Sequence, residues 1–239
     1  MILEDDYRSE ILEKLAQTIL DEGKKAEVKA ILLKSEGEKA FCAGASFDEL
    51  VAIENEKEGL KFFSGFANVI NAMRCCPKFI IGRVQGKCVG GGVGLAAAVD
   101  YCIASEKSAV KLSELAVGIG PFVVGPVIER KMGSAAFMQM AIHAAEWHES
   151  AWAKEKGLFA ELHNNIVELD ASVNRLANFL TSSNPEAMEE MKKIFWAGTD
   201  DWDRLLKERA AISGRLVLSE FTRKAIEKFK QAADRKSVV

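Results

Sequence analysis

The segment from Val84 to Asp100, VQGKCVGGGVGLAAAVD, places the strongest constraint on how this chain can fold. An apolar run from Phe79 to Val84 has the composition of a strand and leads into the glycine triplet Gly90–Gly92. The run from Val93 to Val99 consists of apolar, mostly small residues and has no polar face, which is typical of a buried helix. The sequence therefore predicts a strand, a glycine turn and a helix that is covered all round.

This turn has the features of an anion site. Successive glycines allow positive φ and let another molecule approach the backbone closely. A helix that begins there presents unpaired N–H groups and the positive end of its dipole, which suits a phosphate, a carboxylate or a developing oxyanion. The dinucleotide fingerprint fails because Leu95 stands at its third glycine position, and no Gly-Lys-Ser/Thr follows. Close packing of helix on strand without a ligand is the alternative interpretation.

Two further segments combine small residues with a turn. The segment FCAGAS, ending at Ser46, closes an apolar run, and Ser46 is a candidate N-cap for the helix after it. The segment KLSEL places Glu114 between apolar residues, just before the turn Gly118-Ile119-Gly120-Pro121. A carboxylate in such surroundings is a candidate acid or base, and a surface or helix-capping role is the alternative.

In this order and spacing, the three segments resemble the crotonase (enoyl-CoA hydratase/isomerase) superfamily, from about Ala30 to the C-terminal helix. The resemblance implies an α/β fold: a spiral of ββα units over residues 1–165 that carries the active site, and a helical oligomerisation region over residues 166–239. It also implies a homotrimer or homohexamer. The substrate would be an acyl-CoA thioester, so that coenzyme A is part of the substrate and no separate cofactor is needed.

The same resemblance implies roles for individual residues. The backbone N–H groups of Ala45 and Gly91 would polarise the thioester carbonyl and hold the enolate formed from it, and Glu114 would be the acid/base. Two such donors in a dry pocket are an effective oxyanion hole. The positions that would border the substrate are Ala43, Gly44, Gly90, Gly94, Pro121, Phe122 and Phe66, together with Phe62 and Phe63. For the aromatic residues, plain core packing is the alternative.

The chain departs from the commonest hydratases at one position. Gly94 stands where these enzymes carry the first of two glutamates, so a water activated by two carboxylates would lose one of them. We expect hydration of a 2-enoyl-CoA, including a branched or carboxylated one, since members that resemble methylglutaconyl-CoA hydratase share the GGGVGL segment. The alternatives are a Δ3,Δ2-enoyl-CoA isomerase with one glutamate and a non-catalytic crotonase-like assembly protein. A serine hydrolase of the related Clp type would need Ser46 or Ser113 with a histidine, and no G-x-S-x-G is present.

Composition argues against several other classes of protein. A net charge of −3 leaves no electrostatic footprint for nucleic acid or an anionic membrane. No apolar run reaches the roughly 18–20 residues that span a bilayer, and no signal peptide is visible, which favours a cytoplasmic protein. The 5 cysteines form no C-x-x-C pair and the 3 histidines show no metal-ligand spacing, so we expect free thiols and no metal.

Hydrophobic periodicity and helix-breaking residues set the positions at which helices and strands are expected. Strands are expected at 28–34, 79–84, 101–104 and 110–112, and the chain from residue 123 onward is expected to be helical. Other expected segments are an N-terminal helix over 6–22, a polar linker at 54–58, a connector at 158–167, and a last helix over 215–233.

Overall fold

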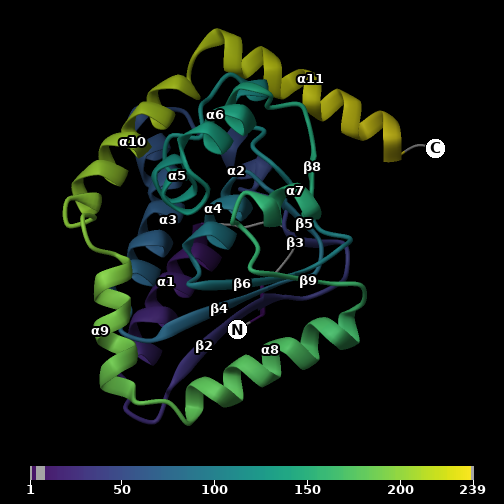
Figure 1. The fold of residues 1–239 in the computed structure, drawn as a ribbon. Helices are drawn as coiled ribbons and strands as arrows, with labels where there is room; N and C mark the ends of the chain where they lie inside the picture. Colours follow the sequence, from purple (N-terminus) through teal and green to yellow (C-terminus); the bar gives the residue numbers. More distant parts are fainter. Residues whose placement is uncertain (1, 4–8, 238–239) are drawn as a thin grey trace.

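Two β-sheets form the centre of the protein (Figure 1), for which a computed structural model describes residues 2–3 and 9–237. A five-stranded sheet has the order β1-β2-β4-β6-β9 and is parallel throughout. A four-stranded sheet has the order β3-β5-β7-β8 and is parallel except between β7 and β8. The strands are β1 (Ile2–Leu3), β2 (Ala30–Ser35), β3 (Ala40–Cys42), β4 (Phe79–Val84), β5 (Lys87–Val89), β6 (Tyr101–Ser105), β7 (Ala109–Lys111), β8 (His148–Glu149) and β9 (Glu161–His163).

From β2 to β7, successive strands alternate between the two sheets. The chain enters the larger sheet at β2, β4 and β6 and crosses each time to the smaller one at β3, β5 and β7. Helices connect the units: α1 (Ser9–Lys24), α2 (Phe47–Val51), α3 (Glu56–Cys75), α4 (Gly91–Ala98), η1 (Leu115–Val117), α5 (Gly125–Met132), α6 (Ser134–Ile142), α7 (Ser150–Glu155), α8 (Ile166–Thr181), α9 (Pro185–Phe195), α10 (Trp202–Leu216) and α11 (Glu220–Ser237). This repeated ββα arrangement with C-terminal helices is the α/β fold that the sequence predicted.

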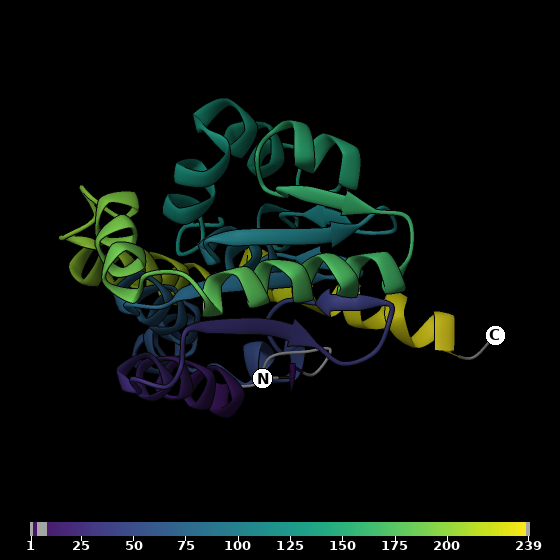
Figure 2. The same cartoon turned by 60° about the horizontal axis from the view of Figure 1, so that its bottom comes forward.

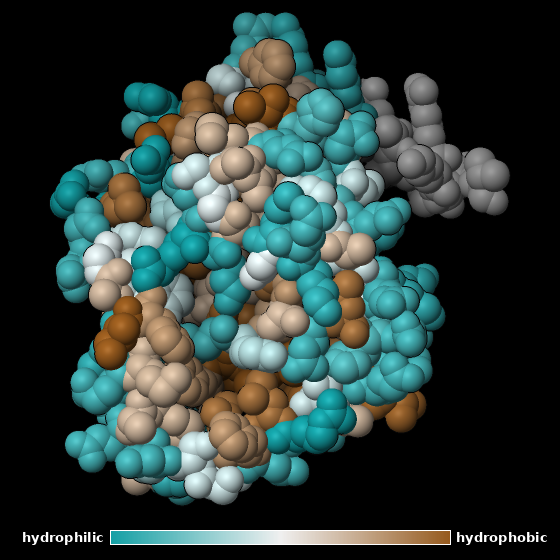
Figure 3. Space-filling view, viewed as in Figure 1, coloured by the Kyte–Doolittle hydropathy of each residue, from teal (hydrophilic) through white to brown (hydrophobic). Residues whose placement is uncertain are grey.

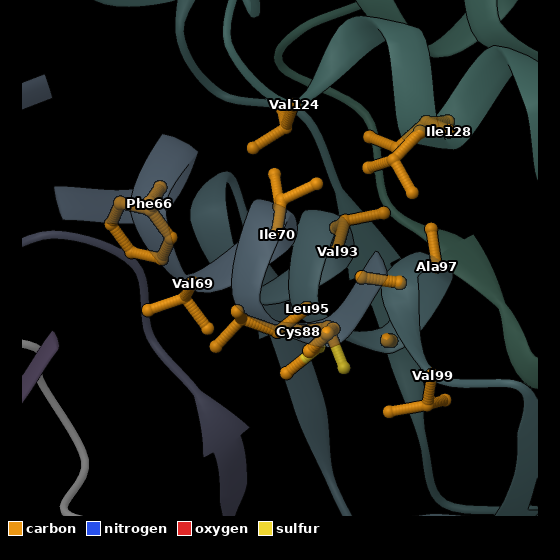
Figure 4. Packing of buried hydrophobic residues seen from close by; sticks show 14 of the residues in the cluster. Phe66, Val69, Ile70, Cys88, Val93, Leu95, Ala97, Val99, Val124 and Ile128 are labelled. Atoms are coloured by element: carbon orange, nitrogen blue, oxygen red, sulfur yellow. The ribbon is translucent and has the colours of Figure 1, made fainter. Parts of the chain in front are cut away.

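The core explains why these segments fold as they do. Along β4, Ile80 points into the main apolar cluster and Ile81 into a second cluster under α8, as the alternation of side chains along a strand requires. Figure 2 shows α8 lying across the strands of the larger sheet. Every residue of α4 is buried, which accounts for its lack of a polar face. Figure 4 shows the surrounding cluster, with Val93, Leu95 and Ala97 of α4 among its members.

Several predicted boundaries were wrong. The polar segment 54–58 is not a linker throughout, because Asn55 accepts a hydrogen bond from the N–H of Glu58 (3.0 Å) and α3 begins at Glu56. The connector 158–167 contains β9, which completes the edge of the larger sheet beside β6, and the two-residue strand β8 was not predicted.

The last helix was also predicted to begin too early. Helix α10 continues to Leu216, and α11 starts only at Glu220, after Ser219, whose Oγ accepts from the N–H of Thr222 (3.2 Å). The expected helix start at residue 6 and the side chain of Phe229 lie outside the described residues.

Of the five cysteines, Cys42, Cys76, Cys88 and Cys102 are buried and Cys75 is exposed. Among the helices that the structure describes, none is both long and apolar enough to cross a bilayer.

Candidate active site

A cavity of about 170 Å³ lies where α3, the two small-residue turns and the segment after β7 meet. Its lining is dominated by apolar side chains and glycines. The residues are Ala43, Gly44, Ala45, Phe47, Leu50, Phe62, Phe63, Phe66, Val89, Gly90, Gly91, Ser113, Glu114, Val117, Ile119, Gly120, Pro121, Phe122, Val123, Val124 and Ser213. A mostly apolar concave site with few polar groups is the usual form of a small-molecule site.

The first turn connects β3 to α2. Gly44 has φ +101°, a conformation that favours glycine, and a Cβ there would lie 3.3 Å from the carbonyl oxygen of Val89. The hydroxyl of Ser46 accepts from the N–H of Glu49 at the start of α2, so the predicted N-cap is confirmed. Ala45, between these two residues, borders the cavity.

The second turn connects β5 to α4. Gly90 has φ +52°, and its N–H donates to the carbonyl of Lys111 (2.8 Å), which fixes the turn against β7. Gly91 is the first residue of α4, where N–H groups have no partner within the helix and the helix dipole is positive. A Cβ at Gly91 would lie 2.2 Å from the ring of Phe66, so α3 and α4 can approach this closely only with glycine here.

Glu114 lies next to this turn. Its carboxyl faces Gly90, where a Cβ would be 3.1 Å from Oε1. Oε2 is buried and has no hydrogen-bond partner in the described part of the chain. Burial raises the pKa of the Glu114 carboxyl to about 7, because loss of solvent disfavours the charged form and a hydrogen bond from its own backbone N–H offsets this only in part. A carboxyl with this pKa can both take up and release a proton near neutral pH.

Val124 occupies the space beside Gly94. A Cβ at Gly94 would lie 2.4 Å from Cγ1 of Val124. Figure 4 shows Val124 above α4, pointing toward Ile70 and the cluster beneath. The volume that a second acid would need is therefore filled by an apolar side chain, and Glu114 is the single titratable side chain among the lining residues described.

The structure brings together all the predicted site residues except Gly94. The candidates Ala45, Gly91 and Glu114 line one cavity, as do Ala43, Gly44, Gly90, Pro121, Phe122 and Phe66, and also the aromatic candidates Phe62 and Phe63. Gly94 does not border the cavity, because Val124 covers it.

Sequence reasoning missed several lining residues, of which Val124 and Ser213 bear most on the chemistry of the site. The first stands in the apolar run after Pro121, where composition alone cannot distinguish a wall of the site from core. The second is on α10, about a hundred residues further along the chain, and no local motif marks it.

The serine and histidine candidates do not form a catalytic pair here. Ser46 uses its hydroxyl as the cap of α2, and none of the three histidines is among the described lining residues, although Ser113 is. In the described residues, no group of three or more His, Cys, Asp or Glu side chains is placed to hold a metal ion.

The fold and sequence can now be compared with known proteins. Residues 5–234 match the family described as enoyl-CoA hydratase/isomerase. A probable enoyl-CoA hydratase of Bacillus subtilis is 25% identical over 223 residues, covering 92% of this chain and 86% of that protein. A short-chain-enoyl-CoA hydratase of Clostridium acetobutylicum is 27% identical over 225 residues, covering 92% and 84%. The crystal structure of an enoyl-CoA hydratase from Bacillus halodurans superposes with a TM-score of 0.85 at 19% identity, covering 94% of this chain and 90% of that one.

The fold is therefore of the crotonase type, with the cavity at the ends of β3, β5 and β7. The family match extends over nearly the whole chain, and the protein belongs to the enoyl-CoA hydratase/isomerase family. It is a crotonase-family protein that resembles enoyl-CoA hydratases by distant similarity.

Proposed function

We propose that this protein moves a proton along the acyl chain of an enoyl-CoA thioester, with Glu114 as the acid/base and the N–H groups of Ala45 and Gly91 as the oxyanion hole. Three features support the proposal. These residues line one cavity, Gly91 begins a buried helix, and the pKa of Glu114 is raised to about 7. Donors aimed at a developing oxyanion in a water-poor site stabilise it strongly.

The observation that carries the choice of reaction is Val124 beside Gly94. Hydration by two acids needs a second carboxylate to orient a water, and Val124 fills that space with methyl groups. A double-bond shift needs no water. The Glu114 carboxylate removes a proton from C2 of a 3-enoyl thioester, the electrons move into the thioester oxygen to give a dienolate, and the resulting acid returns the same proton to C4. The product is the 2-enoyl thioester, and Glu114 is again ionised.

Hydration of a 2-enoyl-CoA is the second candidate, and the relatives favour it. Both the Bacillus subtilis and the Clostridium acetobutylicum proteins are described as hydratases. A single acid would then have to activate the water and protonate C2 in turn, in a cavity where the neighbouring walls are Phe66 and Val124. This geometry makes hydration the slower of the two reactions.

The test is a pair of assays on the purified full chain. With 3-hexenoyl-CoA we expect the absorbance of a conjugated enoyl thioester to rise while the mass stays unchanged. With crotonyl-CoA we expect little gain of a water. Hydration of crotonyl-CoA together with inert 3-hexenoyl-CoA would reverse the assignment. A protein inert toward both, at any substrate concentration, would match the non-catalytic alternative.

The helices from residue 166 onward are the proposed oligomerisation region. Large apolar side chains are exposed on α8 (Val167, Phe179) and on α9 (Met191, Ile194, Phe195). Apolar surface gathers in the lower part of the face shown in Figure 3, in the region of these two helices. Such side chains are expected to be covered when copies of the chain associate as a trimer or hexamer.

A further inference from the structure

Ser213 is a buried polar residue in the wall of the cavity. It is 1% exposed and lines the cavity from α10. Its hydroxyl has no hydrogen-bond partner among the described residues, and, unlike the fully buried Oε2 of Glu114, its Oγ keeps a trace of exposed surface. Other buried serines are satisfied: Ser108 Oγ donates to the carbonyl of Val84 (2.9 Å), and Ser172 Oγ donates to Glu161 (2.5 Å). Buried hydroxyls are normally hydrogen-bonded, so Ser213 stands apart from the others in the core.

The packing of α10 fixes the position of this hydroxyl. The neighbouring residue, Gly214, contacts Gly59 of α3 so closely that a Cβ on either would lie 2.7 Å from the backbone of the other helix. The helices therefore cannot approach further or slide without a clash. Gly59 precedes Phe66 by seven residues on α3, so Ser213 lies about 10 Å along that helix from the wall over Gly91.

The surroundings define the chemistry of a partner. Phe62 and Phe63 also line the cavity, and no lysine, arginine or histidine is among the described lining residues. A carboxylate on the acyl chain would be buried without a cation, which is costly, and its charge would oppose ionisation of Glu114. A neutral carbonyl, amide or hydroxyl pairs with a serine hydroxyl at no such cost.

We propose that Ser213 is a substrate-binding residue whose hydroxyl pairs with an uncharged polar group of the thioester, either an oxygen on the acyl chain or an amide of the pantetheine arm. This rests on the proposed function, since it takes the cavity as an acyl-CoA site. It argues against a carboxylated acyl chain, such as that of a methylglutaconyl-CoA hydratase, as the preferred substrate.

The experiment compares two variants of matched shape, Ser213→Thr and Ser213→Val, because threonine keeps the hydroxyl and valine replaces it with a methyl group. Binding is measured by calorimetry with butanoyl-CoA and 4-hydroxybutanoyl-CoA, which are saturated and cannot be isomerised or hydrated. We expect the valine variant to bind about five- to tenfold more weakly than the threonine variant, as for one neutral hydrogen bond. A loss with both ligands assigns the amide of the pantetheine arm, and a loss with 4-hydroxybutanoyl-CoA alone assigns the acyl oxygen.

Equal affinities of the two variants for both ligands would overturn the proposal. Ser64→Ala is the control, because Ser64 on α3 bonds only the carbonyl of Leu60 within its own helix and does not line the cavity; it should leave both affinities unchanged. If the wild-type protein binds neither thioester, the acyl-CoA site itself fails and this inference with it. If it binds them but does not turn over 3-hexenoyl-CoA, only the reaction assigned above fails.

Discussion

Two carboxylates lie at opposite ends of α4 and differ in their partners. Asp100, just after the C-terminal end, accepts hydrogen bonds from the N–H of Ile80 (2.7 Å), Nζ of Lys192 (2.7 Å) and Nε1 of Trp196 (3.3 Å). Glu114, facing the N-terminal end, has an Oε2 that is buried and unpartnered within the described residues.

The difference separates a structural carboxylate from a reactive one. The partners of Asp100 compensate for its burial and tie α9 to β4 and to the end of α4. Nothing comparable compensates Glu114, so its charged form is disfavoured and its pKa rises to about 7. A buried carboxylate normally has compensating partners, as Asp100 has. A buried carboxylate without them, such as Glu114, is a candidate functional residue.

The largest effect should come from Glu114→Gln. Glutamine keeps the shape of the side chain but cannot exchange a proton, so kcat/KM for 3-hexenoyl-CoA should fall about 10²- to 10⁴-fold, the usual contribution of a general acid/base. Steady-state kinetics and calorimetric binding of butanoyl-CoA should be measured on the same preparation. We expect binding to survive.

The outcome that would count against this assignment is a Glu114→Gln variant with wild-type turnover. The comparison with Asp100 gives the control: Lys192→Met, which disturbs the other carboxylate, should retain most of its activity per folded molecule.

The second effect concerns stability. Lys192→Met leaves Asp100 buried without its cation, and breaking one partner of a buried pair typically costs about 3–5 kcal/mol. The free energy of unfolding, from urea titration monitored by circular dichroism, should fall by this amount.

Lys193→Met is the matched control for this loss. Lys193 is the next residue, but its side chain is exposed and pairs with Glu189 and Glu190 at the surface, so its loss should cost about 1 kcal/mol or less. Equal losses in the two variants would mean that the Asp100–Lys192 pair does not hold α9 on the core.

Much of the fold was readable from the sequence because its signals are local. The order of the apolar segments predicted the ββα units. The run without polar residues after Gly90–Gly92 predicted the buried helix α4. The errors fell on strands that form only by pairing with a distant part of the chain. Strands β8 and β9 are two and three residues long, and they pair with β7 and β6, respectively. The break at 217–219 depends on a serine cap that an apolar pattern does not reveal.

The residues of the site also fall into those that the sequence predicted and those that only the structure revealed. The residues in the two turns and Glu114 were predicted because they stand in contiguous motifs that resemble those of the family. No local motif marks Val124 or Ser213. Val124 matters because it packs against Gly94, and Ser213 because α10 packs on α3 where Gly214 meets Gly59. The empty space at Gly94 was visible in the sequence, but what fills it was not.

The smallest expected effect is also the most direct test of why Glu114 differs from a compensated carboxylate. In the unfolded chain this carboxyl titrates near 4.5, and in the folded protein its pKa is about 7. Between these values the folded protein keeps a proton that the unfolded chain has lost, so stability contributed by the neutral carboxyl falls as pH rises and is gone above about pH 7. At about 1.4 kcal/mol per pKa unit, the loss amounts to roughly 3 kcal/mol. Glu114→Gln cannot lose this proton, so its free energy of unfolding relative to wild type should rise by that amount between pH 4.5 and pH 8 in paired urea titrations. Parallel curves for the two proteins across this range would show that the carboxyl is solvated or paired after all, and that the two ends of α4 are electrostatically alike.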